Sequence, residues 1–294
     1  MLISIQRAEG FFKMEKEKRA KTIKRTITGV IALPILAVIL IFSNTIIMDI
    51  FTAIIACISM YEYFHCFKST KKANPSQYLG YIFCILIAFT HFVDERLLAY
   101  IMVLIIPFSL VALFTELVLS KGEKNIKDIA VTMLGIYYIP LMIIYLSLIR
   151  NMDLGNGLNG KILVWFVLIA SWGSDVFAYF VGRHFGKHKL TKISPNKTVE
   201  GAVAGIGGAI LLGILFAVLC NTIWNVGINY LVIAIIMAIL SAVGQIGDLA
   251  ASSIKRYCEI KDFSELIPGH GGMLDRIDSI IFVLPFAFIL FNIL

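Results

Sequence analysis

The sequence predicts an all-α, polytopic integral membrane protein with about nine transmembrane helices. Three observations lead to this prediction: 59% of the 294 residues are hydrophobic, only 15% are charged, and the mean hydropathy is +0.87. A soluble domain averages about 45–50% apolar and about 25% charged residues. The shortage of charged residues excludes a disordered chain, and the apolar excess is more than one small water-soluble core can hide.

Nine apolar segments are candidate crossings, because a bilayer takes about 20 mainly apolar helical residues per span. Within lipid a helix satisfies its own backbone N–H and C=O groups. The third segment is the weakest, since it is short and contains His91. The predicted spans are 26–42, 45–64, 78–93, 97–119, 129–149, 162–181, 201–220, 229–246 and 277–294.

Lysine and arginine test this count, because cytoplasmic loops carry an excess of both. With a cytoplasmic N-terminus and nine crossings, 23 of the 26 basic residues fall on the cytoplasmic side. Only Arg96, Arg150 and Lys161 lie outside, as does the C-terminus. The net charge of +7 follows from this bias, so no nucleic-acid partner is expected. We expect a multi-pass protein of the cytoplasmic membrane, with its active site facing the cytoplasm.

Three regions are expected along the chain. Residues 1–25 form a basic cytoplasmic segment that lacks a secretory cleavage site; a helix lying on the membrane surface and a solvated tail both fit it. Residues 26–160 form a scaffold of transmembrane helices. Residues 161–294 carry two polar cytoplasmic loops, 182–200 and 247–278, where any chemistry is expected. The five cysteines form no C-x-x-C pair and are expected to be reduced.

The end of the eighth span places three polar residues on one helical face. Asp248, Ser252 and Lys255 stand at positions i, i+4 and i+7. A carboxylate, a hydroxyl and a cation so arranged are able to hold a metal ion and a phosphate together. Charges flanking an ordinary transmembrane helix give the same spacing, so both interpretations stay open here.

The segment before the last span carries glycines and aspartates. A Gly-rich loop exposes backbone N–H groups that can approach a phosphate closely, although a flexible turn has the same composition. Asp275 and Asp278 lie in the first helical turn that follows, where acidic residues also serve as caps. Asp248 and Asp275 could meet across a helix pair and supply the oxygen ligands that suit Mg²⁺.

These residues carry a resemblance. From Ser252 to Asp278 the sequence resembles, over 27 positions and without departure in the fixed residues, the signature of the phosphatidate cytidylyltransferases (CDP-diacylglycerol synthases). Segments 174–183, 185–187 and 194–201 resemble a second region of that family, with Val176 and Asn196 as departures. The resemblance covers roughly residues 165–294, and the first five spans carry no motif.

The resemblance implies a nucleotidyltransferase of phospholipid biosynthesis. Such an enzyme condenses CTP with phosphatidic acid to give CDP-diacylglycerol and pyrophosphate. It implies Mg²⁺ as cofactor and allows a second cation, K⁺ or divalent, between the aspartates. The bilayer supplies the lipid substrate. The resemblance to the family also allows a homodimer, which no residue of this sequence indicates.

The resemblance also implies residue roles. Asp248 and Asp275 would be metal ligands, and together with Lys255 and Arg256 would form the catalytic group. Asp175, Glu200, Asp262 and Asp278 are each open to three roles: positioning a cation, holding a basic side chain, or contacting the nucleotide. The full set of predicted substrate-binding residues is Asp175, Arg183, Ser194, Lys197, Thr198, Glu200, Ser252, Lys261, Asp262, His270, Gly271, Gly272, Arg276 and Asp278.

Other signals are given simpler interpretations. His184 and His188 have a metal-ligand spacing, but a basic loop explains them better. The glycines at 201, 205 and 208 are expected to pack one helix closely on a neighbour rather than to bind nucleotide. Glu62 and Glu116, near cytoplasmic span ends, are expected to have no special role.

Two alternative functions fit parts of the sequence. A CTP-dependent polyprenol or phytol kinase would transfer the γ-phosphoryl group to a lipid alcohol, but the intact run from Lys255 to Asp278 argues against it. A transporter would show charges in the middle of spans and repeated halves. The sequence has neither an acidic residue at a span centre nor a repeat.

Overall fold

The computed structural model describes residues 34, 37–40, 42, 45–155, 157–267, 269 and 271–294. The basic segment 1–25, most of the first predicted span and His270 lie outside the described residues.

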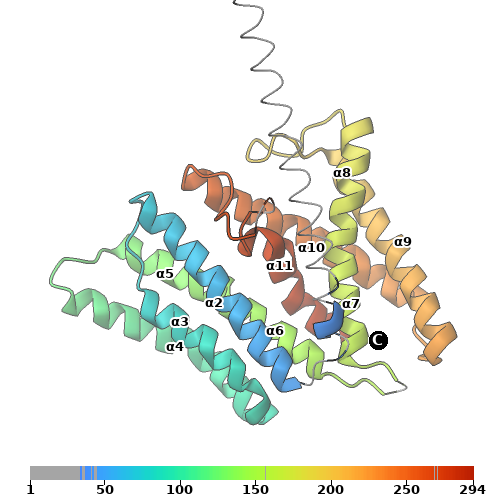
Figure 1. Ribbon diagram of the computed structural model, residues 1–294, viewed down its shortest axis with the longest axis horizontal. Coiled ribbons are helices and arrows are strands. Elements are labelled where there is room, and N and C mark those ends of the chain that lie inside the picture. Colours follow the sequence, from blue (N-terminus) through green and yellow to red (C-terminus); the bar gives the residue numbers. More distant parts are fainter. Residues whose placement is uncertain are drawn as a thin grey trace, which may run out of the picture.

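All regular elements in these described ranges are helical, as the composition predicts. A 3₁₀ helix, η1 (Ile87–Phe92), follows α3, and a π helix, η2 (Ile169–Gly173), joins α7 to α8. The α-helices are α2 (Thr45–Ser69), α3 (Gln77–Leu86), α4 (Glu95–Leu119), α5 (Ile126–Tyr138), α6 (Pro140–Asn151), α7 (Gly160–Leu168), α8 (Ser174–Phe185), α9 (Val199–Trp224), α10 (Tyr230–Tyr257) and α11 (Leu274–Phe291) (Figure 1).

The described helices include six that are long and apolar enough to cross a membrane, and each overlaps a predicted span. The predicted span 78–93 corresponds to a shorter apolar helix, Gln77–Phe92, and the last predicted span to α11, which has 18 residues and charges in its first turn. The chain is a multi-pass membrane protein. The six helices are Thr45–Ser69, Arg96–Leu119, Ile126–Asn151, Gly160–Phe185, Val199–Trp224 and Tyr230–Tyr257.

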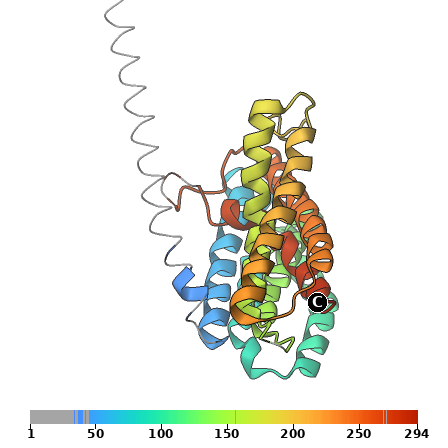
Figure 2. The same cartoon turned by 90° about the vertical axis from the view of Figure 1, so that its right-hand side faces the viewer.

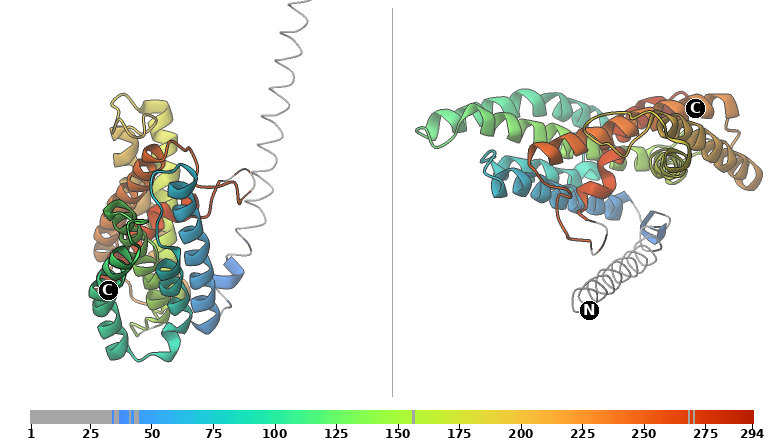
Figure 3. Two further views of the ribbon diagram at one scale, coloured as in Figure 1. Left: turned by 90° about the vertical axis from the view of Figure 1, so that its left-hand side faces the viewer. Right: turned by 90° about the horizontal axis from the view of Figure 1, so that it is seen from above.

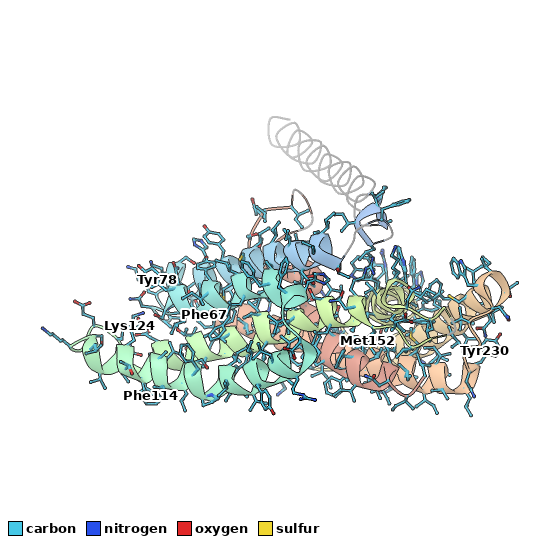
Figure 4. The ribbon with its side chains drawn as sticks, turned by 90° about the horizontal axis from the view of Figure 1, so that it is seen from below. Phe67, Tyr78, Phe114, Lys124, Met152 and Tyr230 are labelled. Carbon is cyan, nitrogen blue, oxygen red and sulfur yellow. The ribbon has the colours of Figure 1, made fainter. Side chains whose placement is uncertain are left out.

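Apolar side chains cover the outside of the bundle. On α4, Val103 is 70% exposed and Phe108 is 61% exposed, although both lie in the middle of an apolar helix. Figure 4 shows Phe114 and Tyr230 at the outer margins of the molecule. In water such a surface would be unfavourable, but lipid tails solvate it well.

Three connections between helices meet at one end of the bundle. The Lys72 ammonium, which follows α2, forms an ion pair with Glu259, which follows α10, at 2.7 Å. This contact raises the pKa of Lys72 and lowers the pKa of Glu259. Lys124, between α4 and α5, donates to the carbonyl oxygen of Asn74 at 3.0 Å. The segments that follow α2, α4 and α10 therefore lie at the same end of the bundle.

Close packing of α8 against α9 depends on glycine. A Cβ added at Gly208 would lie 2.2 Å from Cγ of Phe177, and one at Gly205 would lie 2.8 Å from Oγ of Ser174. Neither position can accept a side chain without displacing α8. The predicted role of these glycines in helix packing is confirmed, and Figure 2 shows the two helices side by side.

The core has two large apolar clusters that share α11. One cluster gathers α7, α9, α10 and α11, and the other gathers α2, α5 and α6 with the ends of α10 and α11. Ile277 packs against both clusters. Figure 3 shows α2 beside the connection from α10 to α11, which projects from the bundle. The N-terminal and C-terminal halves are thus joined where α11 begins.

Candidate functional site

A polar cavity of about 770 Å³ opens where α8, α9 and α10 meet the connection between α8 and α9. Such a volume lies within the range of about 300–1,000 Å³ that is usual for small-molecule sites. Six of the predicted site residues line it: Asp175, Arg183, Ser194, Lys197, Thr198 and Asp248. Local structure positions two of them. Asp175 lies in the first turn of α8, directly after the π helix η2. Thr198 is the N-cap of α9, and its hydroxyl accepts from the Gly201 amide at 3.2 Å.

The first ion pair of the site joins Lys197 to Asp248. Lys197 comes from the connection between α8 and α9, and Asp248 from the last third of α10. Their side chains are 27% and 25% exposed, so both face the cavity while touching one another. The pair brings together the two segments that the family resemblance treats separately.

The second ion pair joins Lys255 to Asp275 at 2.6 Å and is more deeply buried, with side chains 12% and 3% exposed. The other carboxylate oxygen of Asp275 accepts from the backbone N–H groups of Phe263 at 2.8 Å and Gly272 at 3.0 Å. A buried carboxylate with this many donors is well compensated and fixed in orientation. The ion pair also fixes the start of α11 against the end of α10.

Two further carboxylates, Asp175 and Asp278, lie near the first ion pair. The negative charge of Asp248 is close enough to repel both carboxylates. The positive charge of Lys255 attracts the carboxylate of Asp278. The approach of α10 to α11 depends on Gly247, where an added Cβ would lie 2.7 Å from the carbonyl oxygen of Asp278. The site is therefore a strip of aspartates and lysines that spans α8, α10 and α11.

The donor set suits a cation that arrives with phosphate. Within the described ranges, no three His, Cys, Asp or Glu side chains are grouped as a ready-made metal cage. Mg²⁺ in nucleotide sites is usually held by one or two carboxylates together with substrate phosphates, not by an all-protein cage. Asp248 and Asp275 bind different lysines in this structure, and their oxygens are of the type that Mg²⁺ prefers. The residues fit Mg²⁺ on these terms.

The remaining predicted residues are distributed around this strip. Arg183 donates to the hydroxyl of Tyr179 at 2.8 Å, and Arg256 to the carbonyl oxygen of Ile260 at 3.2 Å. Glu200 accepts from the backbone N–H and the ring of His188, so it holds the basic loop together. The other predicted residues are partly or largely exposed at the same end: Ser252, Lys261, Asp262 and Arg276.

The glycine loop makes contacts that spacing did not predict. Gly271 has φ +85°, a conformation that favours glycine. The N–H of Gly272 is directed at the carboxylate of Asp275, and its Cα faces Glu62, with an added Cβ only 2.6 Å from Oε2. In this structure the loop binds two carboxylates of the protein itself.

The expectation that Glu62 has no special role is wrong. Its carboxylate, buried in α2, accepts from the Ser264 hydroxyl and from the backbone N–H groups of Met273 and Leu274. Sequence reasoning missed it because no motif covers α2. The available signal was an acidic residue in a mainly apolar segment, where an unpaired charge is unfavourable.

The contacts of Glu116, by contrast, are local and leave the same expectation standing. Its carboxylate accepts from the hydroxyl of Ser76 and pairs with Lys124 at 3.3 Å. These contacts join the end of α4 to the connection before α3. They lie outside the strip of aspartates and lysines.

Comparison with known proteins assigns the chain to a family. Residues 23–294 match the sequence model of the cytidylyltransferase family. The chain belongs to the cytidylyltransferase family. The family match includes both ion pairs of the site and also α2, which contains Glu62.

Several members of the family are similar over long stretches. A phosphatidate cytidylyltransferase of Bacillus subtilis is 38% identical over 184 residues, which are 62% of this chain and 65% of the relative. The chain thus covers slightly less than two thirds of that protein. A phosphatidate cytidylyltransferase of Staphylococcus epidermidis is 32% identical over 267 residues, which are 90% of this chain and 97% of the relative. One of Staphylococcus aureus is 32% identical over 269 residues, again 90% and 97%.

Proposed function

We propose that this protein is a phosphatidate cytidylyltransferase. It condenses CTP with phosphatidic acid and forms CDP-diacylglycerol and pyrophosphate. The observation that carries the proposal is the adjacency of the Lys197–Asp248 pair in an open polar cavity to the buried Lys255–Asp275 pair. Family membership and the printed names of the relatives support the same reaction.

The polar cavity is the proposed nucleotide site. Lys197 and Arg183 supply positive charge for the phosphates of CTP, while Ser194 supplies a hydroxyl. Lysine binds phosphate as a point charge and arginine through two N–H groups, so both suit a triphosphate. Asp175 lines the same cavity and is a candidate to position a basic side chain, because the positive charges of Lys197 and Arg276 both attract its carboxylate.

The lipid phosphate is proposed to lie near Lys255, Arg256 and Arg276, where the end of α10 meets the start of α11. Apolar surface begins within one turn of these charges: Ile277 and Ile281 of α11 line an apolar hollow that reaches α2 and α7. An amphipathic substrate needs this arrangement, with its headgroup among cations and its acyl chains in lipid.

The reaction joins two anions, so charge neutralisation and alignment are the main tasks of the site. An oxygen of the lipid phosphate forms a bond to the α-phosphorus of CTP. The bond from that phosphorus to the bridging oxygen breaks, and pyrophosphate leaves with the electron pair. A phosphate monoester with a second pKa near ~6 is already largely ionised at pH 7, so no dedicated general base is required.

Asp248 and Asp275 are the proposed Mg²⁺ ligands. The bound ion would supply positive charge that neutralises the phosphate oxygens. Lys197 and Lys255 then stand next to the bound phosphates, because each already touches one of these carboxylates. A second cation, K⁺ or divalent, has candidate neighbours in Asp175 and Asp278, which lie along the same strip.

We also propose the finer topology of nine spans with the N-terminus in the cytoplasm and the C-terminus outside. The ends of α2, α4 and α10 meet at one end of the bundle and carry lysines, which favours the cytoplasm for that end. The active site would then face the cytoplasm, where CTP is found. Residues 161–294 hold the proposed catalytic groups, and residues 26–160 support them.

The decisive experiment uses purified protein in lipid vesicles with CTP, phosphatidic acid and Mg²⁺. We expect pyrophosphate release together with CDP-diacylglycerol. Parallel reactions contain a polyprenol or phytol in place of phosphatidic acid. Formation of CDP and a phosphorylated alcohol would identify a lipid kinase and contradict the proposal.

A further inference from the structure

Glu62 is a buried carboxylate that reaches the active site from the other half of the protein. It lies in α2, outside the segment that carries the family motifs, and it is 1% exposed. Its Oε1 accepts from the hydroxyl of Ser264 at 2.6 Å and from the N–H of Met273 at 2.9 Å. Its Oε2 accepts from the N–H of Leu274 at 2.7 Å.

These bonds place Glu62 at the N-terminus of α11. The helix begins at Leu274, and no side chain of its own N-cap residue, Met273, accepts from its first turn. Helix N-termini carry unsatisfied N–H groups and a partial positive charge, which a carboxylate satisfies. Glu62 therefore does for α11 what an N-cap aspartate normally does, but from a different helix.

The contacts of Glu62 alternate with those of Asp275. Glu62 binds Ser264 and Met273, while Asp275 binds the N–H groups of Phe263 and Gly272, their immediate neighbours. Each carboxylate therefore binds one residue at the start of the loop and one residue at its end. Displacement of Glu62 would shift the N–H groups that orient Asp275.

Gly272 makes this close approach possible. An added Cβ there would lie 2.6 Å from Oε2 and 2.7 Å from Oε1 of Glu62. A side chain at this position would force the carboxylate of Glu62 away from the loop. The contact with Glu62 therefore explains why position 272 requires glycine, without any role in nucleotide binding.

We propose that Glu62 is a positioning residue for the active site: by binding both sides of the 264–273 loop, it sets the orientation of Asp275. This inference rests on the proposed function only for its effect on catalysis. Its structural part, the control of the loop and of Asp275 by α2, can be measured in protein without substrate or metal.

The test compares Glu62→Gln with wild-type protein by hydrogen–deuterium exchange and by kinetics. A glutamine keeps the shape but replaces one acceptor oxygen with a donor, which faces the N–H of Met273 or Leu274. Without substrate or metal, we expect at least tenfold faster exchange within 263–275 and unchanged exchange in α9. In the assay we expect kcat to fall about tenfold, half-maximal activity to need more Mg²⁺, and the KM for CTP to change less than twofold.

Glu116→Gln is the matched control. Glu116 is also a glutamate near the end of a helix, but among the described residues its carboxylate binds Ser76 and Lys124, which lie outside the 264–273 loop. This variant should leave both the exchange of 263–275 and the Mg²⁺ dependence unchanged. Glu62→Asp keeps the charge on a shorter side chain and should recover part of the kcat lost in Glu62→Gln.

A second variant covers the case in which Glu62→Gln does not fold. Gly272→Ala leaves α2 intact and displaces the carboxylate from the loop side, so it should reproduce the faster exchange and the altered Mg²⁺ dependence. Normal exchange of 263–275 in Glu62→Gln would overturn the inference. Faster exchange spread equally over all helices would also overturn it, because the role would then be general stability. If wild-type protein makes no CDP-diacylglycerol, the proposed function fails, while the exchange result still decides the structural part.

Discussion

Lys255 of α10 and Asp275 of α11 are joined at 2.6 Å, with side chains only 12% and 3% exposed. They are twenty positions apart in the chain, and the loop between them turns back so that its N–H groups at Phe263 and Gly272 bind the same carboxylate. Burying such a pair is favourable only when its remaining hydrogen bonds are satisfied. Removal of either partner leaves an uncompensated charge next to the proposed phosphates.

Asp275→Asn should reduce turnover by about 100-fold or more, because the amide is a poor ligand for Mg²⁺ and no longer balances Lys255. Pyrophosphate release in vesicles measures the loss, and insertion into the membrane should be unchanged. The control is Asp94→Asn, at the N-cap of α4, where asparagine caps as well as aspartate. Turnover near the wild-type rate in Asp275→Asn would remove Asp275 from the proposed metal site.

Lys197→Met should raise the KM for CTP by about 10- to 150-fold, the loss expected for one hydrogen bond to a charged group of about 1.5–3 kcal/mol. The dependence on phosphatidic acid should change much less. Lys192→Met, in the same loop but outside the lining of the cavity, should leave both constants near wild type. Equal effects of the two variants would show that general loop charge, and not the position of Lys197, determines CTP binding.

Gly208→Ala should destabilise the packing of α8 on α9 by about 1–3 kcal/mol, because the new Cβ would lie 2.2 Å from Cγ of Phe177. Thermal unfolding in detergent should show a lower Tm. Gly207→Ala is the matched control, since nothing lies within 4 Å of its added Cβ and alanine favours helix. If both variants unfold at the same temperature, close contact at Gly208 does not limit stability.

Cysteines introduced at Glu123 and Lys192 should react with a membrane-impermeant reagent from the cytoplasmic side only. A cysteine at Lys161, in the first turn of α7, should react only from the opposite side. All three side chains are exposed, and the native cysteines other than Cys57 are buried, so wild-type protein gives a low background. Labelling of Lys192→Cys from outside would reverse the proposed orientation of the active site.

Sequence reasoning predicted most of the helices because lipid imposes a simple rule, a long apolar helix for each crossing. Six predicted spans correspond to long apolar helices, whereas α11 starts with charged residues that shorten its apolar part. The glycines of α9 were correctly interpreted because small residues have few other uses within a span. Glu62 was misjudged, since its partners lie more than 200 residues away in the chain.

The sequence by itself determined that this is a membrane-embedded helical protein and which residues between 165 and 294 carry the family's motifs. Composition and helical period suffice for the helical membrane protein, and the resemblance of short continuous segments suffices for the motifs, because all of these are properties of single segments. Only the tertiary structure decided which lysine binds which aspartate, and that α2 supplies Glu62 to the start of α11. Such contacts join different helices, and their distances depend on how the helices pack, which Gly205, Gly247 and Gly272 adjust by allowing close approach.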